Sequence, residues 1–63
     1  MEPKQQISGL IITYNEEKNI QEVLECFDFC DEIIVVDSFS QDKTIEIAKK
    51  NPKVKIIQNK FVD

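Results

Sequence analysis

The sequence predicts an α/β fold in which three parallel strands alternate with two helices, in the order β-α-β-α-β. Short runs rich in Ile and Val, at residues 7–13, 32–37 and 54–58, have the composition of strands buried in a parallel sheet. Apolar residues recur at helical spacing between these runs. The connections, residues 14–31 and 38–53, each exceed the length of about a dozen residues that a parallel crossover needs.

The first half of the chain predicts a strand at residues 7–13 and then a helix of about three turns. Ile20, Val23, Leu24 and Phe27 fall at positions i, i+3, i+4 and i+7. This spacing puts them in one apolar stripe. The polar residues between them are therefore expected to face water.

The second half predicts a strand at residues 32–37, a shorter helix, and a more polar strand at residues 54–58 that includes Lys55. Ser40 is placed to cap the second helix, and Asp42 then falls in its first turn, where a negative charge matches the helix dipole. The helix itself is marked by Thr44, Ile45, Ile47 and Ala48, and the pair Asn51-Pro52 ends it.

Right-handed crossovers and a strand order of 3-2-1 place both helices on the same face of the sheet. Both faces of the strands are apolar, since Leu10, Ile12, Ile34 and Val36 alternate with Ile11, Ile33 and Val35. One face is consequently left without a covering layer. We expect the isolated chain to self-associate through this face, or to be largely unfolded at low concentration.

Length and charge restrict the class of protein. A chain of 63 residues with a net charge of −4 holds one domain at most, and it is too short to bury a large core. We predict a polar tail at residues 1–6 and a partial domain, belonging to a longer one, at residues 7–63. The absence of a basic run excludes a nucleic-acid or anionic-lipid partner.

No stretch of the sequence resembles a signal peptide, and no apolar run reaches membrane-spanning length. Cys26 and Cys30 lie four residues apart in a chain without His, which is neither a metal site nor a redox motif. We interpret both as reduced packing thiols in a cytoplasmic protein.

Ligands of open parallel sheets bind at the carboxyl ends of the strands. Polar or aromatic clusters follow each predicted strand there, at residues 13–16, 37–40 and 59–61. None is a glycine-rich turn, so the dinucleotide fingerprint and the P-loop are both excluded. Acceptor oxygens, hydroxyls and an aromatic ring suit a base and a ribose better than they suit phosphates.

Each candidate residue at this edge also has a structural interpretation. Asp37 is either a ligand for a base or ribose or a turn aspartate, and position alone does not decide between them. Thr13 and Glu16 have the T-x-x-E spacing of a helix capping box. Tyr14 either stacks on a base or packs against the end of the sheet.

Two stretches, IITYNEEKNI and DEIIVVDSFSQDKTIEIAK, resemble the amino-terminal part of family 2 inverting glycosyltransferases, most closely members similar to lipopolysaccharide-core glucosyltransferases. The resemblance spans residues 7–60. It implies the nucleotide-binding start of a glycosyltransferase A fold, in which Thr13 and Tyr14 line the base pocket and Glu16 and Asp37 bond the base or ribose. The complete enzyme would transfer a sugar from a nucleotide-sugar donor to a glycan or lipid-linked acceptor.

The sequence departs from the family pattern at two places. Ile12 stands where many members have proline, and Ser38-Phe39 replaces a common Asp-Gly pair. The subgroup that the sequence resembles usually tolerates serine at the first position of this pair. Phe39 is the larger departure, because it puts a bulky side chain where a flexible glycine is common. We expect it to reshape the ribose pocket.

In the family, the metal-binding D-x-D motif and the catalytic base lie beyond the stretch that this chain covers. We therefore assign no catalytic or metal-binding residue, and we expect Mg²⁺ or Mn²⁺ and the base only in a full-length enzyme, so that the chain alone is inactive. That enzyme is expected in the cytoplasm, either free or at the inner face of the membrane.

Two other classes are disfavoured. A receiver-like or protein-interaction module without catalysis is the main alternative. A receiver needs paired acids after the first strand and a phospho-acceptor Asp after the third, whereas Thr-Tyr-Asn and Gln58-Asn59 stand there. A nucleotidyltransferase needs Gly and Arg in the first turn, and residues 13–19 contain neither.

Overall fold

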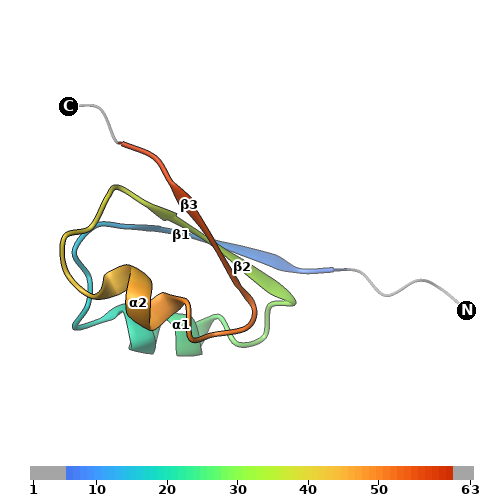
Figure 1. Cartoon of the computed structure of the whole chain (residues 1–63). Helices are drawn as coiled ribbons and strands as arrows, with labels where there is room; N and C mark the ends of the chain where they lie inside the picture. Colours follow the sequence, from blue (N-terminus) through green and yellow to red (C-terminus); the bar gives the residue numbers. More distant parts are fainter. Residues whose placement is uncertain (1–5, 61–63) are drawn as a thin grey trace, which may run out of the picture.

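The computed structural model describes residues 6–60. Its elements follow one another as predicted: β1 (Ser8–Thr13), α1 (Ile20–Cys26), β2 (Glu32–Asp37), α2 (Thr44–Ala48) and β3 (Val54–Gln58) (Figure 1). The division into a tail at 1–6 and a domain at 7–63 stays a prediction, and residues 1–5 and Phe61 lie outside the described range. No helix within residues 6–60 is both long enough and apolar enough to cross a lipid bilayer.

The strands form one parallel sheet in the order β1-β2-β3, which is the predicted order 3-2-1 counted from the other edge. In register, Thr13 lies beside Asp37, and Asp37 lies beside Gln58. The carboxyl ends of all three strands therefore meet at one edge of the sheet, as the parallel arrangement requires.

Figure 1 shows α1 and α2 on the same face of the sheet, as the sequence predicts. The apolar stripe of α1 supplies Ile20 and Leu24 to the core, and α2 supplies Ala48. Side chains alternate along a strand, so every second residue of β1 and β2 faces these helices. The resulting core consists of Ile11, Ile20, Leu24, Cys30, Ile33, Val35 and Ala48.

The opposite face of the sheet is bare, as predicted. Leu10 and Ile12 of β1 are 62% and 65% exposed. The register sets Leu10 beside Ile34 and Ile12 beside Val36, and Ile57 of β3 lies beside Val36. We call the five side chains Leu10, Ile12, Ile34, Val36 and Ile57 the bare face. Apolar side chains left in water forgo about 25 cal/mol for each Å² that burial would remove.

The amino-terminal end of the same surface is polar. The Ser8 hydroxyl donates to Glu32 Oε1 over 2.9 Å, and Lys55 Nζ lies 3.1 Å from Glu32 Oε2. The hydrogen bond from Lys55, then that from Ser8 and the Lys55 charge, hold the pKa of Glu32 below its ordinary value of 4.5. The side of the sheet that the helices leave uncovered is therefore polar at its amino-terminal end, and the apolar bare face occupies the part toward the carboxyl ends of the strands.

Several local predictions are wrong. The helix α1 has seven residues, about two turns and not about three. The Thr13–Glu16 capping box does not form, because α1 begins only at Ile20, after a turn in which the Glu16 carbonyl accepts the Ile20 amide over 2.8 Å. Ser40 does not cap α2, because its amide and hydroxyl bond Asp37 instead. Cys30 is a buried free thiol as predicted, whereas the free Cys26 is exposed and does not pack in the core.

Gly9 allows α1 and its following turn to lie close against β1. A Cβ atom at residue 9 would lie 2.5 Å from Phe27 Cδ2 and 3.0 Å from the buried Cys30 sulfur. The Phe27 ring is half-buried and stacks on Phe29, with 6.3 Å between the ring centroids. A side chain at residue 9 therefore forces the ring or the helix end to move.

We expect Gly9→Ala to destabilise the chain by about 1–3 kcal/mol, the usual effect of overpacking a core. Urea unfolding measures this loss of stability as a lower midpoint concentration, with no change in the dependence of the unfolding free energy on urea. Phe27→Ala in the Gly9→Ala background removes the whole ring, including the clashing Cδ2 atom. The double variant should then lose less stability than the two single changes added together. An unchanged midpoint for Gly9→Ala would contradict the close packing described.

Candidate functional site

The candidate site is the carboxyl edge of the sheet, where the β1–α1 loop (residues 14–19) and the β2–α2 loop (residues 38–43) lie together. The Ser38 amide donates to the Thr13 carbonyl over 3.0 Å, and the Asn59 amide donates to the Asp37 carbonyl over 2.9 Å. These bonds continue the sheet ladder beyond the strand ends. Both loops consequently start from fixed positions.

Ser40 joins the two loops. Its amide donates to Asp37 Oδ2 over 2.7 Å and its hydroxyl donates to Asp37 Oδ1 over 2.5 Å. The same hydroxyl accepts the Asn15 amide over 2.7 Å, and Asn15 Oδ1 accepts the Gln41 amide over 2.8 Å. Asp37 is fully buried, and both of its carboxylate oxygens accept bonds from Ser40. The turn interpretation of Asp37 is therefore confirmed, while a contact with a ligand stays a prediction.

Thr44 and Asp42 join the loops a second time. Thr44 Oγ1 accepts the Glu16 amide over 2.7 Å and donates to Asp42 Oδ1. Asp42 Oδ1 also accepts the Thr44 amide, and Asp42 Oδ2 accepts the Glu17 amide over 3.2 Å. The Lys43 amide in turn donates to Glu17 Oε1. Asp42 therefore lies just before α2, ahead of the N-cap residue Lys43, and not in the first turn of the helix as predicted. It bonds both the Thr44 amide of α2 and the Glu17 amide of the opposite loop.

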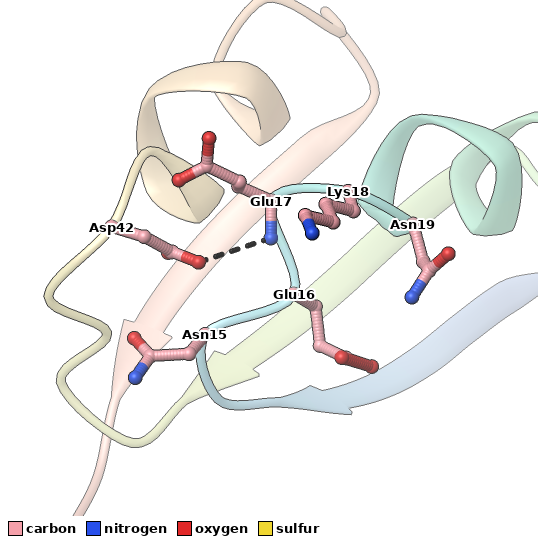
Figure 2. A pocket seen from close by; sticks show the side chains of 6 residues that line it. All are labelled: Asn15, Glu16, Glu17, Lys18, Asn19 and Asp42. Carbon is pink, nitrogen blue, oxygen red and sulfur yellow. Dashed lines mark hydrogen bonds between the residues drawn. The ribbon is translucent and has the colours of Figure 1, made fainter.

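A shallow pocket of about 350 Å³ lies between the β1–α1 loop and Asp42 of the β2–α2 loop. Figure 2 shows Asp42 reaching the Glu17 amide from one wall, while the Glu16 side chain points away from Asp42. The lining carries three carboxylates and one ammonium group, so it is not a preformed anion site. Its residues are Asn15, Glu16, Glu17, Lys18, Asn19 and Asp42.

The residues predicted to bind a ligand all lie at this edge, but their exposure differs. Tyr14 is 53% exposed and Glu16 is also exposed, so both are accessible. Thr13 is only 4% exposed, and within residues 6–60 its buried Oγ1 atom has no hydrogen-bond partner. Asp37 lies beside Thr13 in the neighbouring strand, bonded to Ser40. The structure brings these residues together, while their binding roles stay predictions.

Two loop residues have left-handed backbones, Asn15 with φ 50° and Phe39 with φ 53°. Asparagine tolerates this region, whereas a bulky residue there is an outlier. The left-handed φ explains why glycine suits residue 39, where Phe39 is the departure from the resembled pattern. The role of Asn15 was not predicted, although an asparagine in a tight turn is a sequence signal for a left-handed backbone.

A divalent cation does not fit the described residues. No group of three or more His, Cys, Asp or Glu side chains within residues 6–60 is arranged to hold a metal ion. The carboxylates of Asp37 and Asp42 instead accept hydrogen bonds from Ser40, Thr44 and Glu17. We therefore derive no chemical step through a metal from these residues.

Comparison with known proteins adds one finding. The sequence model of glycosyl transferase family 2 matches residues 8–62, which include the whole sheet, both helices and both loops of the candidate site. A search of curated proteins gives no match.

The bonds to Asp42 make stability depend on pH. Burial raises the pKa of Asp42, but the hydrogen bonds from the Thr44 side chain, the Thr44 amide and the Glu17 amide together bring it below its ordinary value of 3.8. A carboxyl whose pKa is lower in the folded state stabilises the fold above its unfolded pKa. That contribution is lost as the pH falls through the folded pKa.

We expect Asp42→Asn to unfold at a lower urea concentration than the wild type at pH 7, and the difference should shrink as the pH falls below 3.8. Urea midpoints measured from pH 7 to about pH 2 test this expectation. Glu22→Gln, at an exposed position of α1, is the matched control. Its urea midpoint should change with pH in the acid range as the wild-type midpoint does. If the urea midpoints of Asp42→Asn and the wild type differed by the same amount at every pH, the Asp42 carboxylate would not be the source of the pH dependence.

Proposed function

Because the chain belongs to glycosyl transferase family 2, we propose that it forms the nucleotide-binding part of an enzyme that moves a sugar from a nucleotide-sugar donor to an acceptor. The family match over residues 8–62 carries this proposal. The resemblance to lipopolysaccharide-core glucosyltransferases supports inversion at the transferred carbon and a glycan or lipid-linked acceptor of the lipopolysaccharide type. The free thiols of Cys26 and Cys30 suit a reducing, cytoplasmic compartment.

In this proposal Tyr14 and Glu16 make the accessible contacts with the nucleotide. The Tyr14 ring supplies a face on which a base stacks, together with Thr13 in the base pocket. The Glu16 carboxylate is exposed, because its backbone rather than its side chain bonds Ile20 and Thr44. That carboxylate is free to accept bonds from ribose hydroxyls or from a base N–H.

Thr13 and Asp37 are the two buried residues among those proposed to bind the nucleotide. A buried hydroxyl without a partner costs about 1–3 kcal/mol, so a ligand group that bonds Thr13 Oγ1 recovers free energy that the unbound chain forgoes. The Asp37 carboxylate has acceptor sites left beside its two bonds from Ser40, but it is fully buried, so it reaches a base or ribose only if the surrounding loop moves aside. Its second role is to hold the loop that carries Ser40 and Phe39.

Sugar transfer also needs a base that deprotonates the acceptor hydroxyl and a cation that neutralises the leaving diphosphate. We propose that both belong to a longer enzyme that includes this segment, with Mg²⁺ or Mn²⁺ as the cation, and that the segment alone is inactive. A receiver-like module is less well supported, because β1 ends in Thr13 and β3 ends in Gln58, so neither strand ends in an acid.

We expect the chain to bind a nucleoside diphosphate with a Kd in the millimolar range, roughly 4 kcal/mol at 1 M standard state. NMR titration with uridine, cytidine, adenosine and guanosine diphosphates measures this affinity. Thr13→Val replaces the unpartnered hydroxyl with a methyl group. It should therefore keep or raise the urea midpoint while weakening binding about two- to tenfold, the effect of one lost hydrogen bond.

Thr13→Ser retains the hydroxyl and is the matched control, with an affinity close to that of the wild type. Micromolar, metal-dependent binding by the wild type would contradict the proposal that this segment binds the nucleotide while the metal site lies elsewhere in the longer enzyme. Unchanged affinity in Thr13→Val, together with a lower midpoint, would show that the threonine only packs.

We also propose that a second copy of the chain covers the bare face. Three strands spaced by about 4.8 Å, each about six residues long at about 3.3 Å per residue, present roughly 280 Å² per copy. Two stacked faces bury roughly twice that area, well below the ~1,200 Å² of a stable interface. The area therefore supports weak, concentration-dependent association.

Sedimentation from about 10 μM to about 1 mM should show an average mass that rises with concentration, because the small interface corresponds to weak affinity. Ile12→Lys places a charge on the bare face and should keep the chain monomeric. Phe29→Ser changes an exposed aromatic residue that lies outside the sheet, and it should associate as the wild type does. A folded wild type that is strictly monomeric at every concentration would contradict this proposal.

A further inference from the structure

Phe39 combines a disfavoured backbone with an exposed side chain. Its φ of 53° lies in the left-handed region, where the Cβ of a residue other than glycine crowds the backbone. Burial of the ring in the core could offset this cost, but 51% of the residue is exposed. The folded chain therefore gains little stability from Phe39 in return for the strain.

The backbone at residue 39 is held on both sides. The Ser38 amide is bonded to the Thr13 carbonyl over 3.0 Å, and the Ser40 amide is bonded to Asp37 Oδ2 over 2.7 Å. These two bonds fix the positions of the residues on either side of Phe39 and so restrict its backbone. The unpartnered Thr13 hydroxyl lies at the same edge. Two separate losses of stability thus fall in one place, which is typical of binding sites.

A second exposed aromatic residue lies nearby. Tyr14 directly follows Thr13, and Phe39 directly follows Ser38, so the bond between the Ser38 amide and the Thr13 carbonyl brings the two aromatic residues onto adjacent stretches of the two loops. Each is about half exposed. Aromatic side chains at such positions provide stacking surfaces for planar rings, and every nucleotide base has a face suited to them.

We infer that Phe39 is a nucleotide-contacting residue whose ring stacks on the base of the donor. This inference rests on the proposed nucleotide-binding function. It assigns a role to a residue that departs from the pattern of the resembled family, where glycine is common. The base, and not the ribose or the phosphates, is the group that Phe39 recognises, because an apolar ring offers no hydrogen bond to hydroxyls or to anionic oxygens.

The test separates the ring from the backbone. Phe39→Gly removes both the ring and the strain, and Phe39→Leu removes the ring but keeps a side chain in the left-handed region. We expect both variants to bind nucleoside diphosphates at least threefold more weakly in NMR titrations. Only Phe39→Gly should also unfold at a higher urea concentration than the wild type. Ribose 5-phosphate, which has no base, should bind the wild type and both variants equally.

Phe29→Leu, at an exposed phenylalanine in the turn that precedes β2, is the matched control and should leave nucleotide affinity unchanged. Wild-type affinity in both Phe39 variants, with weaker binding in Thr13→Val, would overturn the inference and leave the proposed function standing. No binding of any nucleotide by the wild type at millimolar concentrations would overturn both. A lower urea midpoint for Phe39→Gly would show that the ring packs within the fold, and it would also overturn the inference.

Discussion

The Ser40 hydroxyl is the contact on which the candidate site depends. It donates to the buried Asp37 carboxylate and accepts the Asn15 amide, so a single oxygen atom connects the end of β2 to the loop after β1. Hydrogen bonds to a charged group are worth about 1.5–3 kcal/mol, more than most neutral ones. Without this contact, the β2–α2 loop would lose its attachment to the neighbouring loop at the point where Phe39 and Asp37 are held.

The one-sided fold explains why the edge needs such bonds. Both helices cover one face of the sheet, so the core that they form lies to one side of the strand ends. Apolar packing therefore cannot hold both loops from above and below. Polar contacts between the loops, centred on Ser40 and Thr44, fix the geometry instead. Side-chain hydrogen bonds are directional, and they place individual backbone amides more specifically than apolar contacts do.

Much of the fold could be predicted from the sequence, because strands of Ile and Val and the stripe of Ile20 and Leu24 are local patterns. The bare face followed from the order of the elements. The loop contacts could not be predicted, because the Asn15–Ser40 and Glu16–Thr44 bonds join residues 25 and 28 positions apart. Ser40 and Asp42 both have the chemistry of helix caps, and only the three-dimensional arrangement assigns Ser40 to Asp37 and Asp42 to α2. Residue propensities also do not predict the left-handed backbone of Phe39, because phenylalanine rarely adopts a positive φ.

Amide hydrogen exchange at Asn15, Glu16 and Gln41 tests the central claim, that the two loops form one interlocked unit. The Asn15 and Gln41 amides donate to side chains of the opposite loop, and the Glu16 amide donates to the side chain of Thr44 at the start of α2. All three should therefore exchange as slowly as the amides of the central strand β2, through unfolding of the whole chain. Exchange at the rate of an open loop, while β2 remains protected, would contradict the claim and show that the edge is not preformed.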